Sequence, residues 1–499
     1  MRKQLGIFVG VICVVAGLVN APAALASGAG LHVGSRTSVL ARGGKHVDMR
    51  TLPHASSHPQ ASRPMLLRDG RPSGSELSLP KTGGSRSAPS AGTVEPNSFS
   101  LRTNGLTQAT STCEAGCPQS DAQSAISQSY IVEVVDDAIG IYHVDGTPIS
   151  SASLDSFFNT TDSYSHPRVL YDYQWRRWVV LTQDNTTGET GIGVSDTADP
   201  SGTWFTIPIN WNGANADYPI LGMSQDAVVI TANRYSSGVY INSYVAIYKK
   251  AWLYNGTAGS IPAFLVPFNT APSVDEVGFG FKVYYLLSAD AAADTFTVMT
   301  LSNVSTQPKF KAKAPIAHVW DAPTSWAAQP GTSALIDVGD GRFEGPISRT
   351  YNGHLWFVHT IDVSGFPTVE YGRVNGVNNV ISTAQAYHAS SSSDFGGAVN
   401  ANFDNPTVAW AYTDVFDGTP LTDVAQLHQS PFPVHLTGQP FSPVGGAAPA
   451  TVAYGSSTSV SYDLSSTTCT SPPTFISAQY YSASTGEWVT RFVHNTAPC

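Results

Sequence analysis

The sequence predicts an all-β fold, a β-propeller of six or seven four-stranded antiparallel blades that follows a disordered N-terminal segment. Two observations predict this. From about Tyr130 onward, the chain consists of short runs rich in Val, Ile, Thr, Tyr and Trp, which Gly, Asn, Asp and Pro separate. This texture is typical of strands and turns. One strand-turn-strand pattern then recurs about every fifty residues, which is the length of a propeller blade.

The clearest strands are apolar and β-branched, and they lie at 131–135, 177–181, 227–231 and 354–358. Turn residues separate them, as at Asp145-Gly146 and Asn255-Gly256. These dipeptides favour tight turns because Gly, Asn and Asp tolerate a positive φ. Hardly any stretch keeps helical spacing over three turns, so we expect almost no helix.

The repeat places an apolar anchor nine residues before a second strand position: Val169 before Trp178, Ile220 before Val229, and Ile347 before Trp356. The anchors Val169 and Ile220 are 51 residues apart, and Ile347 and Val399 are 52 apart. A pair of β-sandwich domains is the alternative, but sandwiches have no reason to reuse one hairpin pattern. We expect strands near Tyr130 and Trp488 to close the ring in one terminal blade.

The N-terminal region predicts export. Arg2 and Lys3, the apolar run from Leu5 to Val19 and the small-residue end at Ala26 form the pattern of a signal peptide, residues 1–26. No later apolar segment is long enough to span a membrane. Residues 27–112, rich in Ser, Gly, Pro, Arg and His, are predicted to be a low-complexity linker or pro-segment. The propeller domain then covers 113–499, and we expect a secreted, periplasmic or cell-surface monomer.

Charge is divided unevenly along the chain. Residues 27–112 hold 10 basic and 4 acidic side chains, whereas residues 113–499 hold 14 basic and 32 acidic ones. A folded region with a net charge of -18 argues against a nucleic acid partner. It is compatible with calcium or with a neutral or cationic ligand, and it also favours solubility. No cofactor is required by any motif.

Four cysteines remain after removal of the signal peptide: Cys113, Cys117, Cys469 and Cys499. An even number in an exported protein predicts two disulfides. Cys113 with Cys117 and Cys469 with Cys499 is one pairing, and the others stay open. A zinc site is the less favoured alternative, because His494 is the only histidine near any of these cysteines in the sequence.

Several segments resemble a family of secreted bacterial β-propeller proteins that are sialidase-like in shape. The resemblance is carried by Pro167–Asp172, Val194–Trp204, Ala216–Gly222, Thr474–Phe475 and Gly486–Arg491. It covers about Tyr130 to Cys499 and implies a propeller fold. It implies no particular activity, because many members of that family have none assigned. The chain departs from the family pattern at Pro118–Asp121, where the usual Pro-Asp-Thr start is degenerate.

The repeat also predicts a site. His166, Asp217 and Glu344 each stand three residues before an anchor, so we expect them at equivalent places around the mouth of the central channel. Arg168 and Arg349 are expected near the same level. Such a polar ring fits a calcium ion, a sugar or a peptide. The simpler interpretation is that these strands are polar because the channel holds water.

Two functions remain open. The first is a non-enzymatic exported protein that binds a carbohydrate or peptide at the channel mouth. The second is a sialidase-like glycoside hydrolase, in which Asp217 and Glu344 flank the bond and Arg168, Arg234 and Arg349 hold an acidic sugar. The sequence contains no Gly-x-Ser-x-Gly elbow, no His-Glu-x-x-His and no phosphate loop, so no catalytic residue is identified and binding is the leading hypothesis.

Overall fold

The computed structural model describes residues 34–55, 99–111, 120–236, 239–275, 282–290, 293–350, 352–402, 405–427, 432–443, 445–448, 452–453, 458–464 and 473–495. These ranges are built almost wholly of β-strands, with the short helices α1 (Leu154–Phe158) and α2 (Lys250–Leu253) between them. The all-β prediction is confirmed.

The first strands form three consecutive antiparallel sets of four. One set is β4 (Gln123–Ile126), β5 (Tyr130–Val135), β6 (Ala138–His143) and β7 (Pro148–Ser153). The next is β8 (Tyr164–Asp172), β9 (Arg177–Asp184), β10 (Thr190–Ser195) and β11 (Thr203–Asn210). The third is β12 (Asn215–Met223), β13 (Ala227–Ser236), β14 (Val239–Lys249) and β15 (Gly259–Val266).

The later strands continue the pattern. The fourth set is β16 (Ala271–Val274), β17 (Val283–Asp290), β18 (Thr295–Ser302) and β19 (Lys309–Ala312). The fifth is β23 (Ile347–Arg349), β24 (His354–Val363), β25 (Phe366–Asn375) and β26 (Ile381–Ala386). The sixth is β27 (Ser393–Asn402), β28 (Asn405–Asp414), β29 (Thr419–Leu427) and β30 (Gln439–Pro440). Short strands β20 (Ile316–Ala317), β21 (Ala327–Ala328), β22 (Leu335–Asp337) and β31 (Val452–Ala453) lie in the connections.

The last set joins the two ends of the described chain. β32 (Ser459–Tyr462), β33 (Thr474–Tyr481) and β34 (Trp488–Asn495) are completed by β3 (Phe99–Thr107) from the N-terminal region, which pairs antiparallel with β34. The expected closure by a strand near Tyr130 is therefore wrong. That strand, β5, lies in the middle of its own set, and β3 caps the outer edge of the last set instead.

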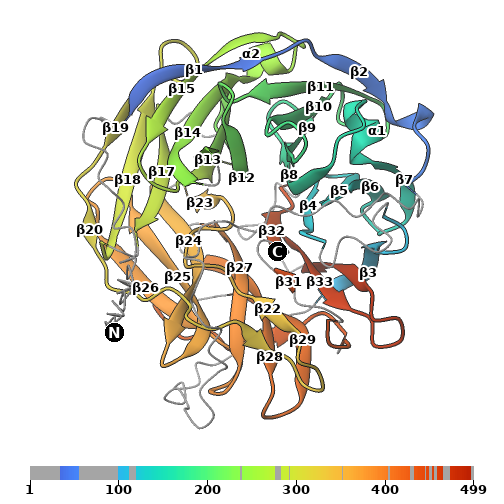
Figure 1. Ribbon diagram of the computed structural model, residues 1–499, viewed down its shortest axis with the longest axis vertical. Helices are drawn as coiled ribbons and strands as arrows, with labels where there is room; N and C mark the ends of the chain where they lie inside the picture. The colour runs from blue at the N-terminus through green and yellow to red at the C-terminus, as the bar shows by residue number, and fades with distance from the viewer. Residues whose placement is uncertain are drawn as a thin grey trace, which may run out of the picture.

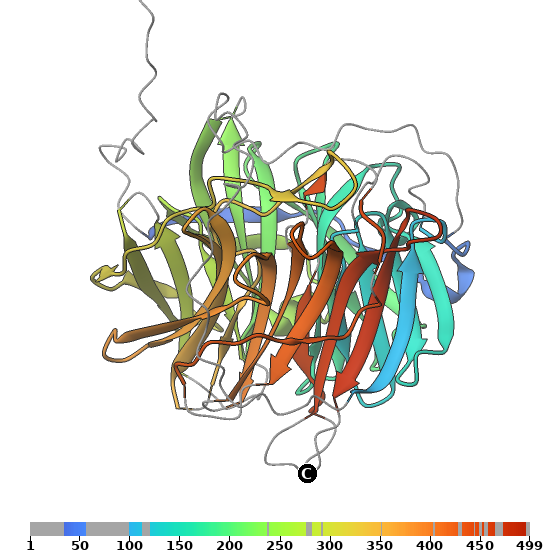
Figure 2. The ribbon, with the colours of Figure 1, turned by 90° about the horizontal axis from the view of Figure 1, so that it is seen from below.

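The first strands of the sets gather around a common centre (Figure 1). β4, β8, β12, β16, β23, β27 and β32 each contact the next, and β32 contacts β4. β12, β16 and β23 also pair in parallel, so these innermost strands run in the same direction. Figure 2 shows the strands of successive sets side by side around the body. This radial order is that of a β-propeller, not of two stacked sandwiches.

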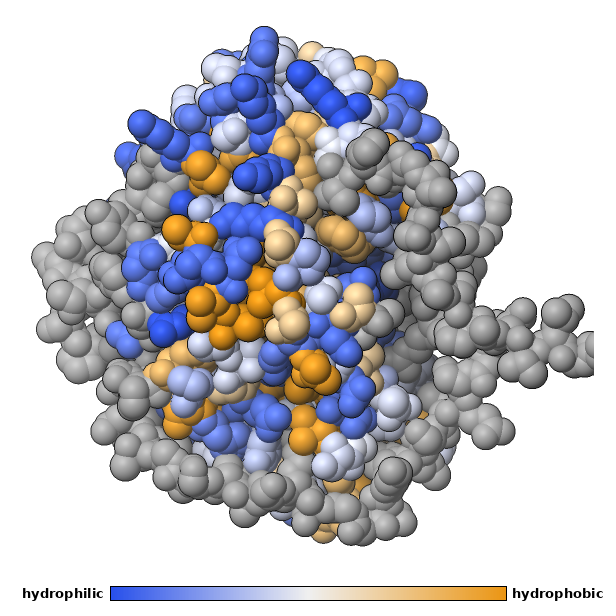
Figure 3. All heavy atoms as spheres, turned by 90° about the vertical axis from the view of Figure 1, so that its left-hand side faces the viewer, coloured by the Kyte–Doolittle hydropathy of each residue, from blue (hydrophilic) through white to orange (hydrophobic). Residues whose placement is uncertain are grey.

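Packing between neighbouring sets buries both faces of most middle strands. Trp178 on β9 is fully buried in one cluster with Val132 of β5, whereas its neighbour Val179 lies in the next cluster with Ile230 of β13. Because each sheet has apolar neighbours on both sides, its middle strands read as nearly continuous apolar runs. The outer rim is mixed, with apolar patches between hydrophilic residues (Figure 3).

Part of the segment that was predicted to be disordered is ordered. β1 (Ser35–Ala41) pairs with β15, and β2 (Lys45–Asp48) pairs with β11. Val39 and Val47 are buried there. These polar strands pair with the outer edges of two sheets, and this pairing satisfies the backbone groups of those edges. The prediction of disorder for 27–112 is thus corrected at 34–55 and 99–111.

Other predictions fall outside the described residues. These are the signal peptide, residues 1–26, and the cysteines Cys113, Cys117, Cys469 and Cys499. Among the residues that are described, no helix has the length and apolar character needed to cross a bilayer.

Candidate functional site

Three residues near the start of successive innermost strands have a left-handed backbone. Asp121, just before β4, has φ of 46°, His166 in β8 has 50°, and Tyr218 in β12 has 53°. The register shifts between Ser165 and Arg168 in β8 and between Asp217 and Ile220 in β12, so both strands carry a β-bulge. Non-glycine residues in this conformation carry about 1 kcal/mol or more of strain, so the surrounding contacts must hold them there.

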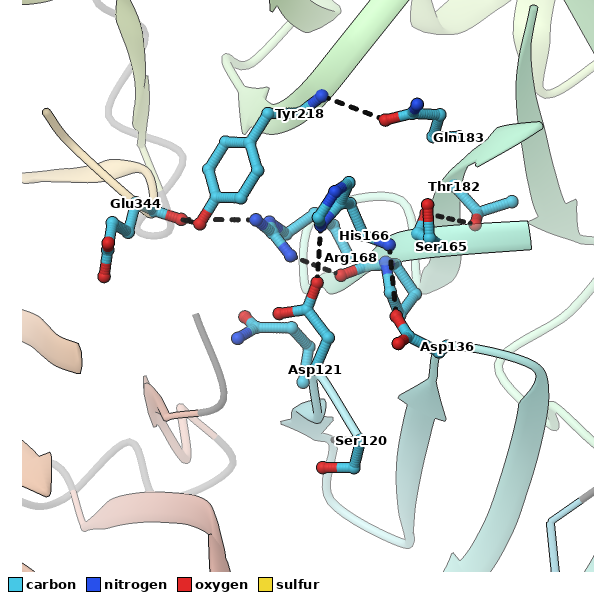
Figure 4. A network of polar contacts seen from close by, with 12 residues as sticks. Ser120, Asp121, Asp136, Ser165, His166, Arg168, Thr182, Gln183, Tyr218 and Glu344 are labelled. Atoms are coloured by element: carbon cyan, nitrogen blue, oxygen red, sulfur yellow. Dashed lines mark hydrogen bonds and ion pairs between the residues drawn. The ribbon is translucent and has the colours of Figure 1, made fainter. Parts of the chain in front are cut away.

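The three side chains form a chain of contacts across their sheets (Figure 4). The Nδ1 of His166 lies 2.7 Å from Oδ2 of Asp121. The His166 ring meets the Tyr218 ring edge-on at 4.9 Å between centroids. The Tyr218 hydroxyl donates to the backbone carbonyl of Glu344 at 3.0 Å. The backbone N–H of Tyr218 is itself held by Oε1 of Gln183 at 3.0 Å.

Arg168 contacts both the Glu344 carbonyl and the Tyr218 ring. Its guanidinium donates to the carbonyl of Pro167 at 2.7 Å and to the carbonyl of Glu344 at 3.2 Å. It also lies 5.1 Å from the centre of the Tyr218 ring, within cation–π range. Tyr218 and Arg168 thus both donate to one carbonyl oxygen, and this ties the starts of β8 and β12 to the segment before β23.

Asp136 lies at the back of the cluster, where its Oδ1 accepts the backbone N–H of His166 at 3.3 Å. Burial raises the pKa of Asp136 well above its ordinary value, and the carboxylates of Asp121 and Asp137 add to this. The hydrogen bond from His166 and the charge of Arg168 act in the opposite direction. The buried Asp136 carboxyl therefore loses its proton less readily than an exposed aspartate does.

His166 is the member of the cluster that can act on a ligand. Asp121 accepts the Nδ1 proton, which fixes the ring and leaves Nε2 as its second functional atom. Within the described part of the chain, the hydrogen bonds of His166 are those of Nδ1 and the backbone N–H. Its side chain is 11% exposed, against 3% for Asp121. The Nε2 edge can therefore accept a hydrogen bond from a bound molecule.

The predicted site residues separate into two groups. His166, Arg168 and Glu344 come together, although Glu344 supplies its carbonyl, while its carboxylate points away from Tyr218 in Figure 4. Asp217 is half-buried beside Tyr218.

The other two arginines are engaged elsewhere. Arg234 donates to Oδ1 of Asn242 at 3.1 Å. Arg349 pairs with Asp275 at 3.2 Å, so it contacts the end of β16, whereas Arg168 contacts the segment before β23. Arg168 and Arg349, which were expected at one level of the channel, therefore bind different segments of the chain.

Sequence reasoning missed Asp121, Asp136 and Tyr218. The apolar anchors aligned His166 with Asp217, but the bulges align His166 with Tyr218, one residue later. Proline was the available signal, since it follows both His166 and Tyr218. A shift of one residue moves a strand side chain to the opposite face, so the aligned residue changes completely. Nothing local marks Asp121 or Asp136, which other strands bring to His166.

The described residues contain no group of three or more His, Cys, Asp or Glu side chains arranged to hold a metal ion. Calcium binding remains a prediction.

Comparison with known proteins identifies no family. No protein-family model matches the chain, and no curated protein matches it. Solved structures with some likeness include an α-L-arabinofuranosidase from Podospora anserina in complex with cellotriose (8% identity, 62% of this chain and 91% of that chain, TM-score 0.32). Others are an exo-β-1,3-galactanase from Phanerochaete chrysosporium with galactose (9%, 79% and 96%, 0.31) and a sialidase from Trypanosoma rangeli in complex with sialic acid (12%, 72% and 57%, 0.27). At these TM-scores the likeness carries no argument about activity.

Proposed function

We propose that the protein is an exported propeller of seven blades that binds a carbohydrate where β8 and β12 begin. The observation that carries this proposal is the buried chain Asp121–His166–Tyr218, which fixes the His166 ring through Nδ1 and leaves its side chain 11% exposed. Each of its members has a strained backbone. Strain of this kind persists where the surrounding structure over-determines it, and it concentrates at ligand sites.

The ligand class follows from the groups presented. With its Nδ1 on Asp121, His166 presents Nε2 as a hydrogen-bond acceptor. This favours a ligand that brings donors, as the hydroxyl groups of a sugar do. The acidic balance of residues 113–499 disfavours polyanions by long-range repulsion. A neutral, hydroxyl-rich molecule satisfies both conditions.

One observation supports hydrolysis as a second candidate. Asp136, whose pKa burial raises, and a second carboxyl, Asp121, both contact His166, and glycosidases divide the acid and base roles between two carboxyl groups. The pair expected from the sequence, Asp217 and Glu344, has less support. Glu344 is buried and directs its carbonyl rather than its carboxylate at the cluster.

The test is a glycan array on the purified full chain, followed by calorimetry with the glycans that bind. His166→Ala is expected to weaken binding at least about tenfold, since loss of a hydrogen bond to a ligand is worth about 1.4 kcal/mol or more. His46→Ala is the matched control, because His46 is exposed on β2 at the rim. An array on which nothing binds, or equal affinity of the His166 variant, contradicts the proposal. Release of reducing sugar that disappears in Asp136→Asn selects the hydrolase instead.

A further inference from the structure

A second candidate site lies at the other end of β8. His166 is near the start of this strand and Asp172 is its last residue, so the two positions are about 20 Å apart along an extended chain. A cavity of about 10 Å³ opens beside Asp172, lined among others by Tyr171, Gln174 and Lys250. That volume holds about one water molecule.

The floor of the cavity is built from buried, paired charges. Lys250 on α2 lies 2.6 Å from Oδ2 of Asp172, with side-chain exposures of 2% and 3%. Tyr254 donates its hydroxyl to the same oxygen at 2.7 Å. Asp275 also lines the cavity and pairs with Arg349. Two acids and two bases balance here, so the floor presents fixed dipoles without a net charge and favours a neutral ligand.

The β8–β9 turn, whose Gln174 lines the cavity, also carries an exposed aromatic side chain. Trp175 has 43% of its surface exposed, although it packs against Tyr254 at 5.7 Å with an interplanar angle of 78°. Oδ1 of Asp172 accepts the backbone N–H groups of Gln174 and Trp175, each at 3.1 Å. The carboxylate that pairs with Lys250 therefore also fixes the turn that presents Trp175 and the exposed Gln174.

We propose that this turn and its cavity form a binding site for a neutral saccharide. A sugar ring offers an apolar C–H face and a rim of hydroxyl groups. The C–H face packs on the indole of Trp175, and the hydroxyls pair with the amide of Gln174 and with the polar groups of the cavity. An aromatic side chain beside a few placed polar groups is the usual composition of small-ligand sites. The site uses none of the residues of the His166 cluster, so it stands apart from the function proposed above.

The test is calorimetric titration of the full chain with cellohexaose, laminarihexaose, xylohexaose and chitohexaose. At least one of these neutral hexasaccharides is expected to bind. Trp175→Ala is expected to weaken that binding at least about tenfold, and Gln174→Ala to weaken it less. Phe416→Ala is the matched control, because Phe416 is an exposed aromatic residue in another hairpin turn and is expected to leave the affinity unchanged. Equal thermal melting temperatures of the variants establish that the fold is intact.

Two results overturn the inference. One is that no hexasaccharide binds at millimolar concentration. The other is that Trp175→Ala binds as the unaltered chain does. Binding that is lost in His166→Ala but kept in Trp175→Ala belongs to the second result, since it assigns the saccharide to the other end of β8. Binding that is lost in Trp175→Ala and kept in His166→Ala supports this site, whatever the fate of the first proposal.

Discussion

The two ends of β8 are both buried and polar, yet they are stabilised in different ways. At the His166 end, the backbone is left-handed and bulged, and a histidine faces an aspartate. At the Asp172 end, the strand ends in a turn, and Asp172 accepts hydrogen bonds from two backbone N–H groups of that turn. A lysine pairs with the same aspartate. The bulge of β8 therefore lies at the His166 end, whereas the buried pair of full charges, Lys250 and Asp172, lies at the other.

This difference teaches where the fold tolerates change. The ring of His166 can exchange hydrogen bonds with a ligand, whereas removal of either partner of the buried pair Lys250 and Asp172 leaves an uncompensated charge. The His166 end is thus suited to contacts that a ligand alters. The Asp172 end is suited to a rigid platform, and substitutions at the two ends should separate these roles.

The largest effect is expected from Lys250→Met. The substitution leaves the Asp172 carboxylate buried without its cation, which destabilises a protein by about 3–5 kcal/mol. Urea unfolding at pH 7 measures this. His166→Phe at the other end should cost less, about 1–3 kcal/mol, because it leaves one hydrogen bond of Asp121 unmade. Lys45→Met, on the exposed strand β2, is the control and should change the free energy of unfolding by less than about 0.5 kcal/mol. Equal losses at Lys250 and His166 would remove the contrast between the ends.

A pH-dependent effect is expected from Asp275 at the Asp172 end. Burial raises the pKa of Asp275 from 3.8 to about 6, although Arg349 opposes the shift. The folded state therefore binds more protons than the unfolded state in this range, and its stability falls as the pH rises from about 4 to about 6. A shift of two pKa units corresponds to about 3 kcal/mol.

Asp275→Asn cannot titrate, so the variant should lack that part of the fall. Free energies of unfolding at pH 4, 5, 6 and 7 for both proteins test this. Glu133, whose pKa burial raises to about 7, contributes a fall in the same direction to both proteins and cancels in the difference. Parallel curves for the two proteins would refute the assignment.

The strands that were predicted from the sequence are those whose neighbours cover both faces. Trp178 and Trp356 are fully buried, and the apolar runs around them follow from that environment. β3 was missed because its side chains alternate between partly buried and exposed within a polar segment. Its stability comes from tertiary contacts, such as the bond between the N–H of Leu106 and Oε2 of Glu133 at 2.9 Å, which no local pattern reveals.

Only part of the candidate site was predicted, because bulges and tertiary contacts decide the rest. Residue types at the start of β8 indicated His166 and Arg168, and the structure places both in one cluster. The bulge in β12 then exchanges Asp217 for Tyr218, because an extra residue changes which side chain faces inward. Asp121 reaches His166 from 45 residues away, through the radial packing of two sheets.

The smallest effect is expected from Tyr218→Phe at the His166 end. The change removes the hydroxyl that donates to Glu344 but keeps the ring against His166 and Arg168. Since Arg168 still donates to the same carbonyl, the loss of one hydrogen bond should lower the free energy of unfolding by only about 1 kcal/mol. Tyr130→Phe, whose ring stacks on His143, serves as the control in the same urea titration and should change it by less than about 0.5 kcal/mol. If Tyr218 positions His166, carbohydrate affinity should fall in Tyr218→Ala, which removes the ring, and remain nearly unchanged in Tyr218→Phe. Equal affinity of both variants would mean that the strained tyrosine supports the sheet and not the histidine.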